Sequence, residues 1–364
     1  MKVSWDQVHA WRLRRQYVDP RGTADANEVI GRLCGVQAQV ASSAELAVRI
    51  RQAEPEDDGI ERGLADRSLV KTWAMRGTLH VLRSADAPSF LSLIASARTW
   101  EKGAWQRTFG ATPKEVEALV EIVSELLDGV ALTRDELVTE IVTRQEFGRL
   151  EEQLRSGWGA LLKPLAWQGA LCHGPSQGNK ITFTRPDWSA MPGPAEAAPA
   201  AIAAYLGAYG PATPEVFNAW LLRGALKKTT VRGWFTAVGD RLTRIDIDGQ
   251  EAYLLSEHVD DLARTEPSPS VRLLGAFDQY VLGPGTGDTR ILPAAHRAKV
   301  SKTAGWISPL VVVDGRITGV WELVDDEVSV SFFPGTPKPS SSEVKAEVAH
   351  LVRAVGRHLT FRIT

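Results

Sequence analysis

The chain has little cysteine. Among its 364 residues, only Cys34 and Cys172 are cysteines. Two thiols are too few for a disulfide framework, a zinc finger or an iron–sulfur cluster held by four cysteines. We therefore expect both to be buried thiols.

Long hydrophobic runs are also missing. No apolar stretch approaches the roughly 20 residues that a membrane-spanning helix needs. The first residues, Met1 to Asp6, lack the apolar core of a secretory signal. A composition of 44% hydrophobic and 24% charged residues is nonetheless sufficient for ordinary buried cores. We expect a cytoplasmic protein that binds no membrane.

Several common catalytic motifs are absent. None of the seven histidines belongs to a His-x-x-x-His zinc motif. The loop Gly283–Gly287 is followed by Asp288-Thr289-Arg290 instead of the Gly-Lys-Ser/Thr of a Walker phosphate loop. Cys172 and His173 are neighbours on a predicted strand, so their side chains should point to opposite faces and not form a thiol–imidazole pair. We expect no metal and no other cofactor.

The segment Gln37-Ala38-Gln39 offers two side chains that cannot ionise. In a helix, residues i and i+2 point in nearly opposite directions, whereas in an extended segment they share one face. Asn27–Cys34 has helical apolar spacing that Gly35 ends, and Ser42-x-x-Glu45 is typical of a capping box that begins the next helix. Both amides should therefore project together from an extended connection between helices. Two polar residues on a solvated turn are the alternative.

The net charge of −2 argues against a protein that coats nucleic acid indiscriminately. Basic residues nevertheless gather in two segments that contain no acid, Trp220–Thr236 and Arg290–Lys302, which would suit contacts with DNA phosphates. The candidate DNA-binding residues are Arg223, Lys227, Lys228 and Arg232 in the first segment, and Arg290, His296, Arg297, Lys299 and Lys302 in the second. Solvated surface charge is the alternative.

Three stretches of the chain share one plan, in which helices precede a two-stranded hairpin. The predicted hairpins span Val70–Leu82, Leu171–Thr184 and Leu242–Leu255, and follow predicted helices at Gly59–Ser68, Trp158–Gln168 and Thr229–Val238. The turn Asp248-Gly249, the capping box Thr133-x-x-Glu136 and the helix start Thr213-Pro214-Glu215 support this plan. Helices with a β-wing form a winged helix, which commonly binds DNA and sometimes binds protein instead.

Proline-rich segments, Met191–Pro194 and Thr265–Ser270, separate the third stretch from its neighbours. In the final section, strands are predicted at Val271–Leu274, Tyr280–Leu282, Leu310–Asp314, Arg316–Leu323 and Val328–Phe333, and a helix at Ser341–His358. We predict an α+β protein with three tandem winged-helix units and a C-terminal, small β-barrel-like section with a terminal helix. The expected domains are residues 1–110, 111–193, 194–266 and 267–364.

Four short motifs resemble one protein family. They are Gly35–Gln39, Thr72–His80, Leu273–Tyr280 and Val313–Arg316. With the three hairpins and the final β-section, their order along the whole chain resembles the winged-helix DNA glycosylases of the AlkZ/YcaQ type. The Gln-x-Gln form is most similar to the AlkZ branch, which gives azinomycin producers self-resistance, whereas YcaQ-like members carry Gln-x-Asp.

The resemblance implies a monofunctional DNA glycosylase in which Gln37 and Gln39 are catalytic. Its implied substrate is double-stranded DNA with N7-alkylguanine, including the interstrand crosslinks of azinomycin-like alkylators. We expect a monomer. Because a base tied to the opposite strand cannot rotate into a deep pocket, an open cleft is predicted. The alternative is a non-catalytic winged-helix transcription regulator with the two glutamines as surface residues.

A neutral pair suits this substrate chemically. N7-alkylated guanine already carries a positive charge and needs no proton in order to leave. The reaction then needs mainly a placed water and dipoles that stabilise the sugar cation. Each amide has a carbonyl acceptor and two N–H donors for this purpose.

Overall fold

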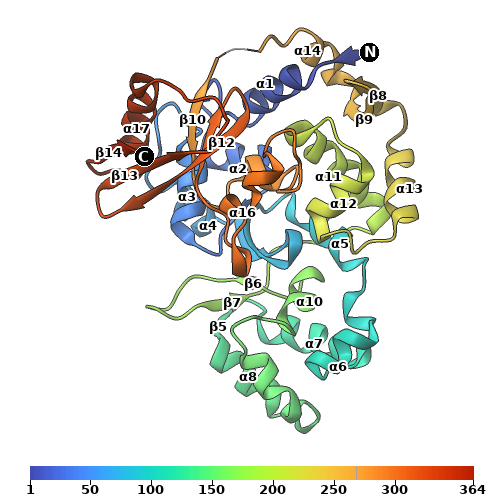
Figure 1. Ribbon diagram of the computed structural model, residues 1–364. Helices are drawn as coiled ribbons and strands as arrows, with labels where there is room; N and C mark the ends of the chain where they lie inside the picture. Colours follow the sequence, from blue (N-terminus) through green and yellow to red (C-terminus); the bar gives the residue numbers. More distant parts are fainter. Residues whose placement is uncertain (268) are drawn as a thin grey trace.

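The computed structural model describes residues 1–267 and 269–364. It combines helices with three β-sheets (Figure 1), which confirms the α+β class. Residue 268 belongs to the predicted linker Thr265–Ser270, and this part of the prediction lies outside the described residues. In the described ranges, no helix has both the length and the apolar character to cross a membrane.

The first two predicted hairpins join in one six-stranded sheet with the order β2-β4-β3-β6-β7-β5. Its strands are β2 (Val36–Gln37), β3 (Leu69–Trp73), β4 (Leu79–Arg83), β5 (Ala131–Thr133), β6 (Cys172–His173) and β7 (Thr182–Thr184). The hairpins meet where Lys71 of β3 pairs with His173 of β6. The sequence predicted each hairpin but not their union, because pairing between distant strands leaves no local pattern.

Helices flank β2 on both sides, as the sequence predicted. The helices of this first stretch are α1 (Trp5–Arg15), α2 (Ala26–Arg32), α3 (Ala41–Arg49), α4 (Gly59–Ala65) and α5 (Ala87–Ala95). The predicted capping box at Ser42 is wrong, because α3 begins after Val40 and no side chain caps it. Ser42 already lies inside the first turn, and Glu45 instead lies 3.9 Å from Arg49.

The second stretch contains α6 (Gly103–Phe109), α7 (Pro113–Leu126), α8 (Arg134–Val142), α9 (Glu151–Arg155) and α10 (Leu162–Trp167). Thr133 and Glu136 form the predicted capping box at the start of α8. Helix α10 is shorter than the predicted helix from Trp158 to Gln168. Gly159 precedes it with φ of 62°, a left-handed conformation that cannot continue a helix.

The third stretch contains α11 (Pro194–Tyr209), α12 (Pro214–Leu222), α13 (Lys228–Val238) and α14 (Val259–Ala263). The predicted hairpin is present as β8 (Leu242–Ile247) and β9 (Gln250–Leu255). Its turn residues Asp248 and Gly249 both have positive φ. The N-terminal strand β1 (Lys2–Val3) pairs in parallel with β8, which no sequence pattern indicated. The predicted domain boundaries stay a prediction.

The final section is an open half-barrel sheet with the order β10-β11-β12-β13-β14. Its strands are β10 (Val271–Leu274), β11 (Leu310–Val313), β12 (Arg316–Val324), β13 (Glu327–Phe332) and β14 (Thr360–Ile363). The terminal helix α17 (Ser341–Val355) packs against β10 at the side of the molecule shown in red in Figure 1.

One predicted strand of this section, Tyr280–Leu282, is wrong. The segment forms a short helix, α15 (Gln279–Leu282). The side chain of Asp278 accepts the Tyr280 N–H at 2.8 Å and so begins the helix. A short apolar run does not distinguish a strand from a buried helical turn, and here the capping residue decides.

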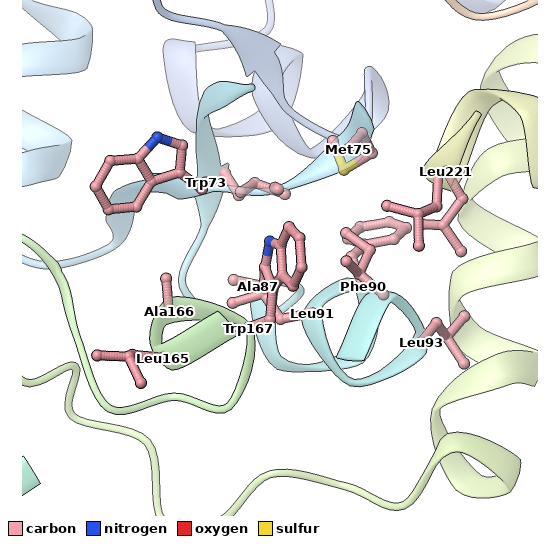
Figure 2. Close-up of a cluster of buried hydrophobic side chains, with 14 of the residues drawn as sticks. Trp73, Met75, Ala87, Phe90, Leu91, Leu93, Leu165, Ala166, Trp167 and Leu221 are labelled. Carbon is pink, nitrogen blue, oxygen red and sulfur yellow. The ribbon is translucent and has the colours of Figure 1, made fainter. Parts of the chain in front are cut away.

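The largest hydrophobic core connects the six-stranded sheet to helices of all three stretches. Figure 2 shows Met75, Phe90, Trp167 and Leu221 among the side chains of this core. Met75 lies in the tight turn between β3 and β4 and is fully buried. The turn is therefore anchored, and this fixes the position of the next residue, Arg76.

Candidate active site

Gln37 and Gln39 lie on an extended segment and touch each other. Gln37 belongs to β2, and its Nε2 donates a hydrogen bond of 2.8 Å to Oε1 of Gln39. The two amides thus share one face, which confirms the extended interpretation. Gly35, with φ of 97°, ends the preceding helical segment and donates its N–H to the Ile30 carbonyl at 2.8 Å.

The two glutamines differ in exposure. Gln37 is only 6% exposed, whereas Gln39 is open to solvent. Val36 and Ala38, which alternate with them, are buried and hold the segment against the core. Gln39 is therefore the more accessible amide of the two.

Arg76 is a third member of the site that the sequence analysis missed as a functional residue. Its Nη2 donates to Oε1 of Gln37 at 3.2 Å, and its Nη1 donates to the Trp220 carbonyl at 3.3 Å. Burial lowers the pKa of Arg76 to about 10, so the guanidinium remains charged at neutral pH. Arg76 lies within the Thr72–His80 motif, but its contact depends on the turn and on α12.

His80 completes the site as a neutral acceptor. It pairs with Gln37 across β2 and β4. Its Nδ1 lies 2.9 Å from the Thr78 carbonyl and must donate there, which leaves Nε2 as an acceptor 3.4 Å from Nη2 of Arg76. Burial first, and the Arg76 charge second, lower the pKa of His80 to about 3. The ring is therefore uncharged at physiological pH.

The site contains no acid. Among the described residues, no Asp or Glu forms a hydrogen bond or an ion pair with Gln37, Gln39, Arg76 or His80. The paired carboxylates of ordinary glycosidases are therefore not present at this place. In the described part of the chain, no cluster of three His, Cys, Asp or Glu could hold a metal ion.

A second cation lies near Arg76. Arg223 is exposed, follows α12 in a left-handed conformation and contributes to lowering the pKa of Arg76. It also lowers the pKa of Lys163 in α10, after the larger effect of burial. Arg223 was a predicted DNA-binding residue and Lys163 was not. The structure thus brings one predicted cation into the neighbourhood of the glutamine pair.

The other residues of the first basic group lie at the start of α13. Lys227 is its N-cap, Lys228 is its first residue, and both are exposed. In the described structure neither lysine has an ion-pair partner. Arg232, one turn further, pairs with Glu215 at 2.6 Å.

The residues of the second basic group make more contacts with other protein side chains than those of the first group do. Arg290 pairs with Asp288 at 2.5 Å and lies over the Trp5 ring at 4.0 Å. His296 stacks on Phe333. The other three members are Arg297, which is 3.4 Å from the Thr286 hydroxyl, Lys299, which lies over Phe333, and Lys302, which is 3.7 Å from Glu322. No hydrogen bond among the described residues joins this group to the glutamines.

Other possible sites in the structure have ordinary explanations. The segment Gly174–Gly178 has the pattern Gly-x-Ser-x-Gly, but it connects two strands of a hairpin instead of a strand and a helix, as a nucleophile elbow would. Cys34 and Cys172 are both buried, and burial raises the pKa of the Cys172 thiol to about 12. The cavities of about 260 and 560 Å³ contain neither glutamine in their linings.

Comparison with known proteins identifies the family. A family model described as DNA glycosylase AlkZ-like matches residues 30–357. The chain belongs to this family. It is 55% identical over 362 residues to an interstrand DNA cross-link repair glycosylase of Streptomyces sahachiroi, with 98% of each chain covered. The solved structure of Streptomyces sahachiroi DNA glycosylase AlkZ matches with a TM-score of 0.98 and 54% identity over the whole of both chains.

This AlkZ-like glycosylase therefore has the fold that the sequence motifs indicated, including the half-barrel section and the terminal helix. Because this family is one of DNA glycosylases, the comparison does not favour the alternative of a non-catalytic transcription regulator. It also accounts for the order of the four motifs, two of which, Gly35–Gln39 and Thr72–His80, meet in the structure at Gln37 and Arg76.

Proposed function

We propose that this AlkZ-like protein hydrolyses the N-glycosidic bond of N7-alkylguanine in double-stranded DNA and unhooks interstrand crosslinks made by azinomycin-like alkylators. Gln37 and Gln39 are the catalytic residues of this proposal. The observation that carries it is the neutral amide pair, with Gln39 exposed and Gln37 hydrogen-bonded beneath it.

The chemistry follows from the charge of the substrate. When the bond between the sugar C1′ and the guanine N9 breaks, its electron pair moves into the cationic ring and neutralises it. The sugar becomes an oxocarbenium ion, a water oxygen attacks C1′, and a water proton passes to solvent. The products are an abasic site and a neutral 7-alkylguanine, and no step needs a protonated enzyme acid.

The amides stabilise this transition state by position and dipole. The Gln39 carbonyl uses one lone pair for the Gln37 N–H and keeps another for water or for the developing sugar cation. Bases that are not already cationic leave poorly under these conditions, so selectivity arises from the leaving group. No amine forms a hydrogen bond with the pair in the described structure, which favours direct hydrolysis over a covalent sugar–lysine intermediate.

Four cations supply the proposed path for the DNA backbone. We assign phosphate contacts to four basic residues that lie in or next to α10, α12 and α13. They are Lys163, Arg223, Lys227 and Lys228. We further propose that the protein acts as a monomer in the cytoplasm, on chromosomal DNA. Size-exclusion chromatography with light scattering tests the monomer directly.

The central test is base release from duplexes with N7-methylguanine or an N7–N7 crosslink. Gln37→Ala, Gln39→Ala and the double variant should lose most of the single-turnover rate while they remain folded by circular dichroism. Gln106→Ala is the control, because the side chain of Gln106, on α6, donates its one hydrogen bond to the carbonyl of Glu101 in the turn before this helix. An unchanged rate in the double variant would remove the glutamines from the mechanism. Sequence-specific binding without base release by the wild type would favour the regulator instead.

A further inference from the structure

Arg76 is the first donor in a hydrogen-bond chain that ends at the exposed amide. The chain runs from Nη2 of Arg76 to Oε1 of Gln37 at 3.2 Å, and from Nε2 of Gln37 to Oε1 of Gln39 at 2.8 Å. We propose that Arg76 is a positioning residue that fixes the orientation of both amides. The proposal rests on the catalytic function proposed for Gln37 and Gln39.

The direction of the chain follows from what each group can donate. A guanidinium only donates, so the atom of Gln37 that faces Arg76 must be the carbonyl oxygen. The NH2 group of Gln37 is then directed at Gln39, and the atom of Gln39 that meets it must also be an oxygen. The half-buried Arg76 therefore fixes which end of each amide is the oxygen.

A fixed orientation matters for the reaction. An amide that flips exchanges a carbonyl oxygen for an NH2 group at nearly the same place. The oxygen stabilises a sugar cation, whereas the NH2 group opposes it. With Arg76 present, the lone pairs of the Gln39 oxygen and its two free N–H groups have defined directions for water and substrate.

Two features of Arg76 are energetically unfavourable, its backbone conformation and its lack of a negatively charged partner in the described structure. The residue has φ of 58°, a left-handed conformation that a side chain with a Cβ rarely adopts. Its partners Gln37, His80 and the Trp220 carbonyl are all neutral, and no carboxylate in the described structure pairs with it. Strained backbone of this kind is concentrated at functional sites.

Two anchors hold Arg76 in this place. Met75, the preceding residue, is fully buried in the same core cluster as Phe90 and Leu221 (Figure 2). The Trp220 carbonyl lies in the last turn of α12, where carbonyls lack a partner within the helix and attract a cation. Arg76 therefore also stabilises the end of α12, and a test must separate this structural contribution from positioning.

The first measurement compares Arg76→Met and Arg76→Lys with the wild type in single-turnover base release. We expect Arg76→Met to lower the rate constant by about 10- to 100-fold, as for the loss of a hydrogen bond to a charged group. Arg76→Lys keeps a charged donor and should recover part of the rate. Arg98→Met is the matched control, since Arg98 also has positive φ but pairs with Glu101 at the surface. An Arg76→Met rate equal to that of the control would overturn the proposal.

A double-mutant cycle separates positioning from structural support. If Arg76 acts through Gln37, then Arg76→Met should change the rate by less than about threefold in a Gln37→Ala background, because the effects of coupled residues are not additive. If Arg76 only supports α12, the two losses should multiply. Multiplied losses would overturn the proposal.

A measurement that does not depend on enzymatic activity tests the positioning role of Arg76 separately from the proposed catalytic function. The side-chain NH2 signals of Gln37, assigned by their absence in Gln37→Ala, should be protected from hydrogen exchange in the wild type and lose this protection in Arg76→Met. Equal protection in both proteins would overturn the positioning role. A wild type that releases no base, but shows this difference in protection, would refute the proposed reaction and leave the positioning role intact.

Discussion

Arg51 and Asp278 form a bidentate ion pair in which neither side chain is exposed. Nη1 and Nη2 of Arg51 lie 2.8 and 2.7 Å from the two carboxylate oxygens of Asp278. Arg51 follows α3, the helix after the glutamine pair, and Asp278 begins α15 in the final section. The pair therefore joins the end of the helix that follows the glutamine segment to the C-terminal section.

Breaking this pair should destabilise the protein strongly. Arg51→Met leaves the Asp278 carboxylate buried without a counter-charge, and we expect the free energy of unfolding to fall by about 3–5 kcal/mol. Urea denaturation measures the change. Arg51→Met combined with Asp278→Asn removes both charges but keeps an oxygen to cap α15, so it should recover most of the loss. A double variant that is as unstable as the single variant would contradict this explanation.

Base release should be nearly independent of pH between about 5 and 8.5, because no group of the site titrates there. Burial and Arg76 hold the pKa of His80 at about 3, and burial lowers that of Arg76 only to about 10. The rate should fall when His80 gains a proton near pH 3, and again when Arg76 loses its charge near pH 10. Single-turnover rates on N7-methylguanine duplexes test the plateau, and a bell-shaped profile with a midpoint between pH 6 and 7 would indicate a different acid or base.

Buried histidines should make the fold sensitive to acid. Burial, followed by the charges of Arg12 and Arg316, lowers the pKa of His9 from 6.5 to about 3. Below pH 6.5 the unfolded chain binds a proton at His9 that the folded chain does not, so stability is present above this pH and is lost as the pH falls toward 3. We expect a contribution of about 1.4 kcal/mol per pH unit.

Denaturation curves between pH 7 and pH 4 measure this slope. His9→Leu should reduce it by about that amount, since the titrating group is gone. His358→Leu, which replaces an exposed histidine, is the control and should leave the slope close to that of the wild type. A slope that is unchanged in His9→Leu would mean that His9 is protonated in the folded protein.

We expect the two basic groups to contribute differently to DNA binding. Lys228 is exposed and has no ion-pair partner in the described structure, so Lys228→Ala should reduce the salt slope of binding by about one and leave the melting temperature unchanged. Arg290 is engaged by Asp288 and Trp5, so Arg290→Ala should lower the melting temperature and leave the salt slope unchanged. Fluorescence anisotropy over a salt series distinguishes them, and the reverse pattern would place Arg290 on the DNA.

The parts of the site that the sequence predicted are those that local chemistry decides. Gly35 ends one helical segment, and alternation places Gln37 and Gln39 on one face. Asp248-Gly249 likewise predicts its hairpin because the turn needs positive φ at both residues. Contacts between distant segments were not predictable in this way, since Arg76 reaches Gln37 only after the β3–β4 turn has packed on α12.

The sequence also failed to predict the structure where a tertiary contact outweighs the local hydrophobic pattern. The alternation around Tyr280 suits a strand, but Asp278, held by Arg51, caps a helix there. The pairing of β1 with β8 similarly depends on how α1 packs against α11 and α14, which no local pattern specifies.

Gln39 is the residue whose charge should decide which bases can leave. Gln39→Asp brings a carboxylate close to the place where the sugar cation is proposed to develop. We expect activity on N7-methylguanine to be retained and the relative rate on uncharged bases to rise, because a negative charge stabilises the cation more than an amide dipole does. Gln39→Asn is the matched control, since it has the same length as aspartate without the charge. The measurement is the ratio of base release from N7-methylguanine and from unmodified guanine in the same duplex. Identical ratios for the wild type, Gln39→Asp and Gln39→Asn would show that the charge at this position does not set the substrate range.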